Sequence, residues 1–164
     1  MKKIRITPVV VAILVLCFIT SVYAAYASYV VSYAKIGNGS YGNIYDIEGG
    51  PDGYYCELYG GNYGDGAIVN VYATAQISPG APIYMYGYSA AGYRSHVYVY
   101  ISNNNNDWYL VGSGYLDAYS YPGSMSPGYV YVGDAPISGR YIGISAYDDQ
   151  GWSAKVLVDF VYSP

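Results

Sequence analysis

The side chains able to carry out chemistry are few in this sequence of 164 residues. His96 is the single histidine, so catalysis of the Ser–His–Asp kind would have to use it, and no Gly-x-Ser-x-Gly motif occurs. A zinc site needs several nitrogen or sulfur ligands, and His96 with Cys56 supplies too few. Glycoside hydrolysis needs two positioned carboxylates, whereas turn positions account for most of the acidic residues. The sequence therefore predicts a protein that is not an enzyme.

Tyrosine is the residue type that points to binding instead. The chain has 26 tyrosines but only 2 phenylalanines and 2 tryptophans. A tyrosine ring is apolar on its faces and polar at its tip, so sugar rings can lie on it while the hydroxyl forms hydrogen bonds. We expect neighbouring strands to bring several of these rings within cross-strand reach of one another. The candidate ligand-binding residues are Tyr84, Tyr86, Tyr88, Tyr98, Tyr100 and Trp108.

These aromatic residues lie in runs where aliphatic and tyrosine side chains alternate, which is the period of a β-strand. In residues 97–101, for example, valine and isoleucine alternate with Tyr98 and Tyr100. Successive side chains of a strand face opposite ways, so we expect the aliphatics between two sheets and the tyrosines on the outer faces. The run at 155–162 is apolar on both sides except for Asp159, which predicts a central strand.

Clusters of glycine, proline and asparagine separate the runs and predict turns. Asn103–Asn106 is one such cluster, because asparagine tolerates left-handed backbone angles and hydrogen-bonds its own backbone. No helical period follows the first 24 residues. Several short strands with this punctuation predict an all-β fold, an antiparallel β-sandwich of jelly-roll type, preceded by an N-terminal hydrophobic signal helix.

The first part of the chain predicts export. Residues 1–24 have the basic start, apolar middle and small-residue end of a secretory signal peptide, and a retained membrane anchor is the alternative. Residues 25–43 would be an N-terminal arm or the first strand, and residues 44–164 the β-sandwich domain. We therefore expect an extracellular or cell-surface protein, with cleavage after Ala24 or Ala27.

Removal of the leader changes the charge and the cysteine content. Four basic residues remain against eleven carboxylates, a net charge of −7, which argues against nucleic acid as a partner. Cys56 is then the one cysteine, either a small buried hydrophobe or the site of an intermolecular bridge. Asn38-Gly39-Ser40 is an acceptor sequence for N-glycosylation.

Three segments together resemble the discoidin-like, galactose-binding-like group of secreted jelly-roll domains. They are "IEGGPDGYYCELYGG", "VYVYISNNNNDWYLVGSG" and "YIGISAYDDQGWSAKVLVDFVYS", within residues 44–163. The resemblance implies a non-catalytic binding or surface module and a structural Ca²⁺ between an early loop and the closing strands. The oxygen donors at matching positions would be Asp52, Asp148 and Asp159. The chain departs from the pattern in its excess of tyrosine and its lack of arginine-rich sugar-clamping positions.

Two functions follow from this surface. In the first, the tyrosine-rich face binds glycans or other cell-surface material. In the second, the protein is a structural subunit of an extracellular filament or surface coat, and residues 25–36 add a strand to a neighbouring subunit.

Overall fold

The computed structural model describes residues 24–90, 95–116, 128–147 and 154–164. The expected signal helix lies outside this part of the chain. No helix within the described ranges is long and apolar enough to span a membrane.

The described residues form ten strands and one short 3-10 helix. The elements are β1 (Ala25–Ile36), β2 (Ser40–Gly42), η1 (Ile44–Ile47), β3 (Cys56–Gly60), β4 (Gly66–Ile77), β5 (Pro82–Ser89), β6 (Ser95–Ser102), β7 (Tyr109–Leu116), β8 (Gly128–Asp134), β9 (Gly139–Tyr147) and β10 (Ala154–Ser163). Every strand pair is antiparallel, which confirms the all-β, antiparallel prediction.

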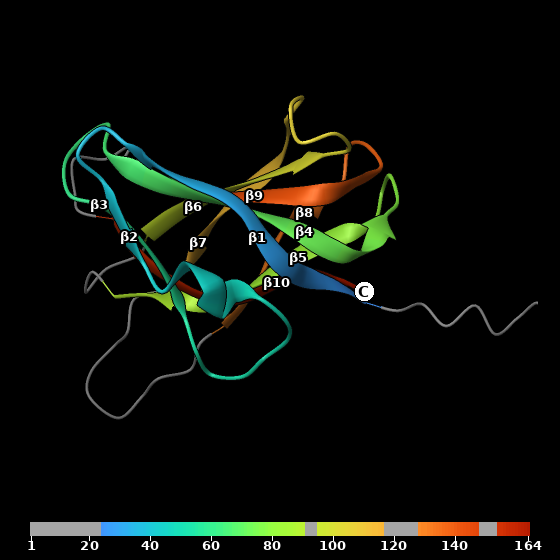
Figure 1. Ribbon diagram of the computed structural model, residues 1–164, viewed down its shortest axis with the longest axis horizontal. Helices are drawn as coiled ribbons and strands as arrows, with labels where there is room; N and C mark the ends of the chain where they lie inside the picture. Colours follow the sequence, from blue (N-terminus) through green and yellow to red (C-terminus); the bar gives the residue numbers. More distant parts are fainter. Residues whose placement is uncertain (1–23, 91–94, 117–127, 148–153) are drawn as a thin grey trace, which may run out of the picture.

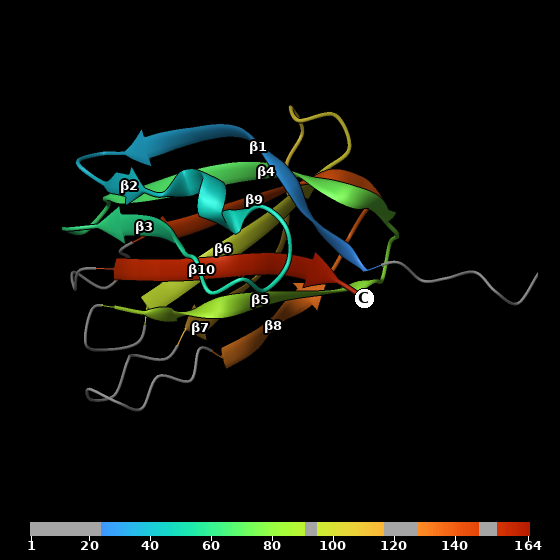
Figure 2. The ribbon, with the colours of Figure 1, turned by 60° about the horizontal axis from the view of Figure 1, so that its bottom comes forward.

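The strands form two layers that pack face to face (Figures 1 and 2). Sheet A has the order β2-β3-β10-β5-β8, and sheet B has the order β1-β4-β9-β6-β7. The first strand belongs to both layers: Ala25 and Tyr26 pair with the end of β10, and from Ala27 onward β1 pairs with β4. Strand β10 lies between β3 and β5, as its apolar sequence predicted.

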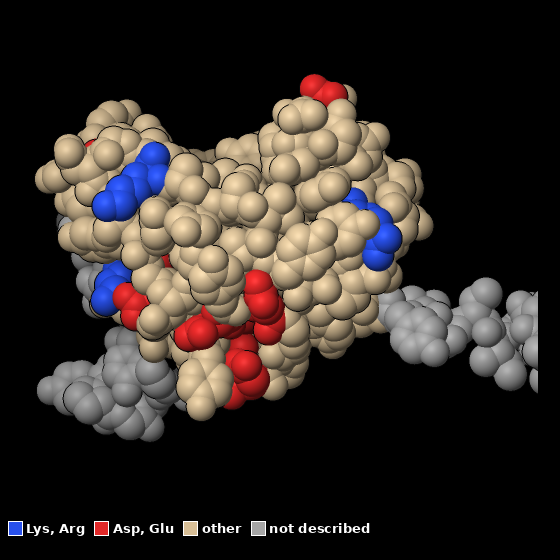
Figure 3. Space-filling model, in the orientation of Figure 1, with Lys and Arg blue, Asp and Glu red and all other residues tan. Residues whose placement is uncertain are grey.

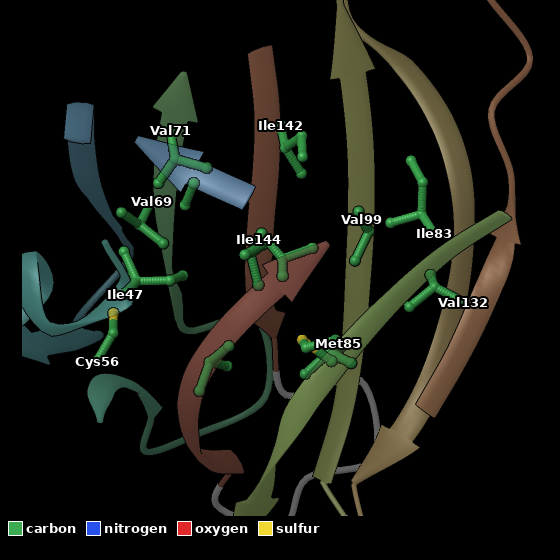
Figure 4. Packing of buried hydrophobic residues seen from close by; sticks show 14 of the residues in the cluster. Ile47, Cys56, Val69, Val71, Ile83, Met85, Val99, Val132, Ile142 and Ile144 are labelled. Carbon is green, nitrogen blue, oxygen red and sulfur yellow. The ribbon is translucent and has the colours of Figure 1, made fainter. Parts of the chain in front are cut away.

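The space between the sheets is filled by aliphatic side chains (Figure 4). In β5, Ile83 and Met85 are fully buried, whereas Tyr84, Tyr86 and Tyr88 are half-buried on the outer face. Strand β6 follows the same pattern. The prediction that aliphatics lie inside and tyrosines outside is therefore confirmed for both strands, and the outer faces of the sandwich are aromatic.

The pairing of β5 and β6 differs from the expectation. They were expected to be neighbours, but β5 pairs with β10 and β8 in sheet A, while β6 pairs with β7 and β9 in sheet B. The connection between them crosses from one layer to the other, so their outer faces look in opposite directions. Alternation assigns each side chain to a face of its own strand, but it does not assign strands to a sheet.

An irregularity in β10 reverses its alternation. The pairing of β10 with β5 shifts between Val158 and Phe160, and Asp159 occupies the extra position. Before this bulge Val158 is in the core, and after it Val161 takes that side. Phe160 consequently lies on the outer face with the tyrosines.

Residues 25–36 are part of the protein's own sandwich rather than a free arm. Their pairing with β4 extends from Ala27 to Ile36, so the strand that could be donated to a neighbour is already engaged. Asn38, in the turn after β1, is exposed, and its glycosylation stays a prediction.

Cys56 lies in the core beside Ile47 (Figure 4). Its side chain is 0% exposed, and burial raises the pKa of its thiol to about 12. The burial favours the interpretation as a small hydrophobe over an intermolecular bridge.

We therefore expect the Cys56 thiol to be unreactive in the folded protein. In a chain without residues 1–24, which also removes Cys17, a chromogenic disulfide reagent should modify no thiol in native buffer and one thiol in denaturant. Rapid modification of the native protein, or a dimer that disappears with reductant on a gel, would contradict the buried position.

Candidate functional site

The six predicted ligand-binding residues fall on two opposite surfaces. Tyr84, Tyr86 and Tyr88 lie on the outer face of sheet A, and Tyr98, Tyr100 and Trp108 lie on or beside the outer face of sheet B. The expectation of one continuous platform is thus wrong, because β5 and β6 belong to different layers. Each surface is considered separately.

The outer face of sheet A carries a ladder of stacked rings. Tyr26, Tyr162 and Tyr84, on the neighbouring strands β1, β10 and β5, stack at centroid distances of 5.8 Å and 5.4 Å and interplanar angles of 19° and 23°. Tyr86 stacks on Phe160 at 5.1 Å and 22°. Rings that stack on one another cover each other's faces, so this ladder presents mainly edges and hydroxyl groups.

The two ends of the sheet A ladder are also occupied. The ring of Tyr131 lies next to that of Tyr84, at a centroid distance of 5.6 Å, and its hydroxyl donates a hydrogen bond to Asp134 at 2.9 Å. That hydrogen bond raises the pKa of Tyr131 above its ordinary value. Tyr88 packs edge-on against Tyr55 at 5.1 Å. The contacts of this face are therefore largely within the protein.

The outer face of sheet B is built differently. Its central rows hold mostly small or polar side chains from β1, β4 and β9, which pair across the sheet, and Ile68 is the large one among them. The floor of this surface, which we call the trough, consists of Ser32, Ala34, Ile68, Asn70, Gly143 and Ser145. Larger side chains stand on both sides of it. In the space-filling view the upper surface is hollowed between two lobes, and the ribbon in the same orientation runs β4, β9 and β6 below the hollow (Figures 1 and 3).

One side of the trough is a wall of three tyrosines. Tyr29, Tyr72 and Tyr141 form a cross-strand row on β1, β4 and β9. Tyr29 stacks on Tyr72 at 5.2 Å, and Tyr72 meets Tyr141 edge-on at 5.0 Å. The guanidinium carbon of Arg140 lies 4.7 Å from the Tyr72 ring centroid, and its Nη2 donates to the carbonyl of Thr74 at 2.9 Å.

The other side is formed by Trp108 with Tyr98 and Tyr100. Trp108 lies over Gly143: a Cβ on Gly143 would be 3.2 Å from Cζ3 of the indole and 2.8 Å from Oδ1 of Asn70. The absence of a side chain at Gly143 therefore leaves room for the Trp108 ring. Asn70 donates from Nδ2 to Ser32 at 2.9 Å, while its Oδ1 is buried and has no hydrogen-bond partner among the described residues.

The turn before Trp108 is fixed by its own side chains. Oδ1 of Asn104 accepts hydrogen bonds from the backbone N–H groups of Asn106 and Asp107, both at 2.9 Å. Oγ of Ser102 accepts from the N–H of Asn105 at 2.9 Å, and Asn105 has a left-handed φ of 62°. The asparagine turn is confirmed, with the chemistry expected of it. This rigid turn positions the indole over the trough.

His96 is not placed for catalysis. Its ring stacks on Tyr115 at 4.4 Å and 6°, and contacts Tyr98 at 4.5 Å. It is one member of the aromatic outer face, as its position at the start of a strand indicated. No group of three or more histidine, cysteine or acidic side chains that could hold a metal gathers within the described part of the chain.

Two of the three residues expected to bind calcium do meet. The backbone N–H groups of Asp52 and Gly53 donate to the Asp159 carboxylate at 3.4 Å and 3.2 Å, and the N–H of Tyr54 donates to Oδ1 of Asp52 at 2.9 Å. Asp148 lies outside the described residues. The carboxylate oxygens that can be placed already accept backbone hydrogens, and they supply far fewer than the six to eight donors that Ca²⁺ takes. By themselves they do not form a calcium site, so calcium stays a prediction of the resemblance.

Asp159 nevertheless has an electrostatic property that a cation would change. It is 2% exposed, and desolvation raises its pKa above 3.8, although the two N–H donors oppose this. Since its pKa is higher in the folded than in the unfolded protein, its contribution to stability is present at low pH and is lost as the pH rises through that raised value. A cation beside Asp159 would stabilise its charged form.

If calcium binds here, adding it to chelator-treated protein at pH 7 should raise the melting temperature. At a concentration a hundred times the Kd the stabilisation is ~2.7 kcal/mol. Asp159→Asn should remove the response, whereas Asp46→Asn should keep it. Identical melting curves with chelator and with calcium would exclude the metal.

Comparison with known proteins bears on the fold. No protein-family model matches the sequence, and no curated protein matches it. Among solved structures, a pectin-binding carbohydrate-binding module aligns over 79% of this chain and 87% of its own, with a TM-score of 0.51 and 12% identity. The CBM32 module of AlyQ, solved in complex with 4,5-unsaturated mannuronic acid, aligns over 84% and 97%, with a TM-score of 0.52 and 10% identity.

The fold is the galactose-binding-like jelly roll. This confirms the resemblance carried by the three segments of the sequence, which contain all or most of β3, β6, β7, β9 and β10, five of the ten described strands. At identities of 10–12%, the likeness of this jelly roll to the two modules concerns the path of the chain.

Several residues of the jelly roll's trough were missed at the sequence level. Tyr72, Tyr141 and Asn70 lie in runs whose alternation did place them on an outer face, but nothing in the alternation favoured them over other tyrosines. These residues can be identified only from the register of the paired strands. The register aligns Tyr29, Tyr72 and Tyr141 in one row and places small or polar residues in the row beside it.

Proposed function

We propose that this protein is a non-catalytic carbohydrate-binding module that acts outside the cell and binds a glycan in the trough of sheet B. The observation that carries the proposal is the arrangement of the trough: a row of small or polar residues, Ser32, Asn70 and Gly143, beside a tyrosine wall, with Trp108 over Gly143. Sugar rings require aromatic faces together with hydrogen-bonding groups, and this surface offers both.

The trough fits a glycan better than the sheet A ladder does. In the ladder, Tyr26, Tyr162 and Tyr84 are stacked nearly parallel, so the central ring has neighbours on both faces. On sheet B the row next to the tyrosine wall consists of Ser32, Asn70 and Gly143 and has no large side chain, so a sugar can approach the wall from the hollow visible in Figure 3. Tyr98, Tyr100 and Trp108 are thus retained as proposed ligand contacts, and Tyr29, Tyr72 and Tyr141 are added.

The structural neighbours support a glycan as the partner. One is described as pectin-binding, and another was solved with a mannuronic acid derivative. Their shared jelly roll does not locate a binding surface on this chain, so the choice of the trough depends on its own side chains. The alternative of assembly by strand donation is not favoured, because β1 is paired within the protein.

The proposal is tested by measuring glycan binding to wild-type protein and to variants on the two faces. Trp108→Ala and Tyr72→Ala should each weaken binding at least tenfold, which corresponds to a loss of about 1.4 kcal/mol. Tyr84→Ala, on the ladder, is the matched control and should bind like the wild type. Melting curves of all three variants establish that the sandwich remains folded.

Two results would contradict the proposal. If Tyr84→Ala abolished binding while the trough variants bound normally, the glycan would be held by sheet A. If a broad glycan array and insoluble polysaccharides gave no binding at all, the function itself would be wrong.

A further inference from the structure

The described basic side chains of the protein differ in whether they have an acidic partner. Lys155 in sheet A lies 3.8 Å from Glu57 and forms an ion pair with it. Arg140, at the edge of the trough, contacts the Tyr72 ring and a backbone carbonyl instead. No carboxylate among the described residues is within ion-pair distance of its guanidinium. Lys35, likewise without an ion pair among the described residues, lies 5.9 Å from the centroid of the Tyr41 ring, so Arg140 is the unpaired cation that borders the tyrosine wall.

The Arg140 guanidinium is held in a fixed place. Its face lies over Tyr72, and Nη2 donates to Thr74. Its Nε is buried and has no hydrogen-bond partner among the described residues. A ligand cannot reach the buried Nε, but Nη1 and the second hydrogen of Nη2 form no hydrogen bond with the described residues and can donate as a fork to the two oxygens of a carboxylate.

The acidic side chains are placed away from the trough or are already engaged. In Figure 3 most of the visible Asp and Glu side chains gather below the hollow and one lies at the top of the lobe beside it, while blue Lys and Arg side chains lie to its two sides. Asp65 is buried, and its carboxylate accepts hydrogen bonds from Asn38 and Asn62. Asp107, in the turn beside Trp108, accepts one from Asn104 at 2.8 Å. Among the described charged side chains, Arg140 is the one that contacts the tyrosine wall.

We propose that the trough selects glycans that carry carboxylates, that is, chains containing uronic acid residues. The carboxylate pairs with Arg140, which lies over Tyr72, while the sugar ring lies against the half-exposed ring of Tyr29 beside it. The proposal rests on the proposed function, since it names the class of glycan that the same trough takes. Neutral glycans of the same shape lack the group that would neutralise Arg140, so they bind less well.

The test compares oligogalacturonate with the same oligosaccharide after complete methyl esterification, which removes the charge and keeps the sugar backbone. Titration calorimetry of the wild-type protein should give at least tenfold tighter binding of the acid than of the ester. Arg140→Gln should remove this difference, and Arg140→Lys should restore part of it, because the charge returns without the fork. Lys155→Gln, on sheet A, is the matched control and should keep the full preference.

The possible outcomes separate this inference from the function on which it rests. If acid and ester bind the wild type equally, or if neutral glycans bind in a Trp108-dependent way and the acid does not, selection of carboxylates is wrong and the carbohydrate-binding function stands. If Arg140→Gln still binds the acid more tightly than the ester, Arg140 does not bind the carboxylate. If no glycan of any kind binds, both proposals fall. The comparison of acid with ester uses unmodified protein, so it does not depend on a variant that folds.

Discussion

Replacing Ile144 with alanine should lower the free energy of unfolding by about 2–5 kcal/mol. Ile144 is 0% exposed and lies on β9, the central strand of sheet B, where it pairs with Val69 on one side and Val99 on the other. Figure 4 shows it in the middle of the core, facing the side chains of sheet A. Removal of its side chain leaves a cavity that the paired strands cannot close without losing their register.

Urea denaturation followed by circular dichroism measures this loss. Ile144→Val should cost less, about 0.5–1.5 kcal/mol, because most of the side chain remains. Leu110→Ala removes an aliphatic side chain that is 53% exposed, and it should stay within about 0.5 kcal/mol of the wild type. If Ile144→Ala were as stable as Leu110→Ala, the packing of the two sheets described here would be incorrect.

Replacing Gly87 with alanine should destabilise sheet A, although only one methyl group is added. Gly87 lies on β5 opposite Val158, and a Cβ at this position would overlap the carbonyl oxygen of Leu157 on β10. Backbone atoms of a paired strand cannot rotate away as a side chain can, so the two strands would have to separate. Overpacking of this kind costs about 1–3 kcal/mol, and occasionally more.

The matched control for this change is Gly50→Ala. The nearest atom to a Cβ there is a ring carbon of Tyr26 at 3.9 Å, which is an ordinary contact. Thermal melting of the two variants should therefore show a lower melting temperature for Gly87→Ala and little change for Gly50→Ala. Equal melting temperatures would mean that β5 and β10 are not as close at Gly87 as the pairing requires.

The sequence predicted the local features of this protein well. Alternation placed Ile83 and Met85 inside and Tyr84 outside, and the chemistry of asparagine predicted the turn at 103–106. These predictions succeed because each depends on a residue and its neighbours along the strand. The bulge at Asp159, which shifts the register of β10 by one position, was not predicted, because the run at 155–162 is apolar on both sides and shows no alternation.

The candidate site could be predicted only in part, because it depends on which strands are neighbours. The choice of Tyr98, Tyr100 and Trp108 came from one hairpin, and these residues do share a surface. Their combination with the tyrosines of β5 assumed that consecutive strands pair, but the chain crosses between layers after Ser89. Besides β7, the strand that pairs with β6 is β9, some forty residues further along the sequence, where no local signal identifies it.

The pairing of Ala25 with Ser163 brings the two ends of the described sandwich to one place (Figure 1). A polypeptide that entered at Ala25 and left after Ser163 would do so at neighbouring points, so the whole unit could be inserted as a cassette into a surface loop of another protein. The same proximity permits the ends to be fused by a short linker and the chain to be reopened at Ser78–Gly80, where the backbone is exposed. Such a rearranged chain would keep every strand pair while changing the order in which they are synthesised.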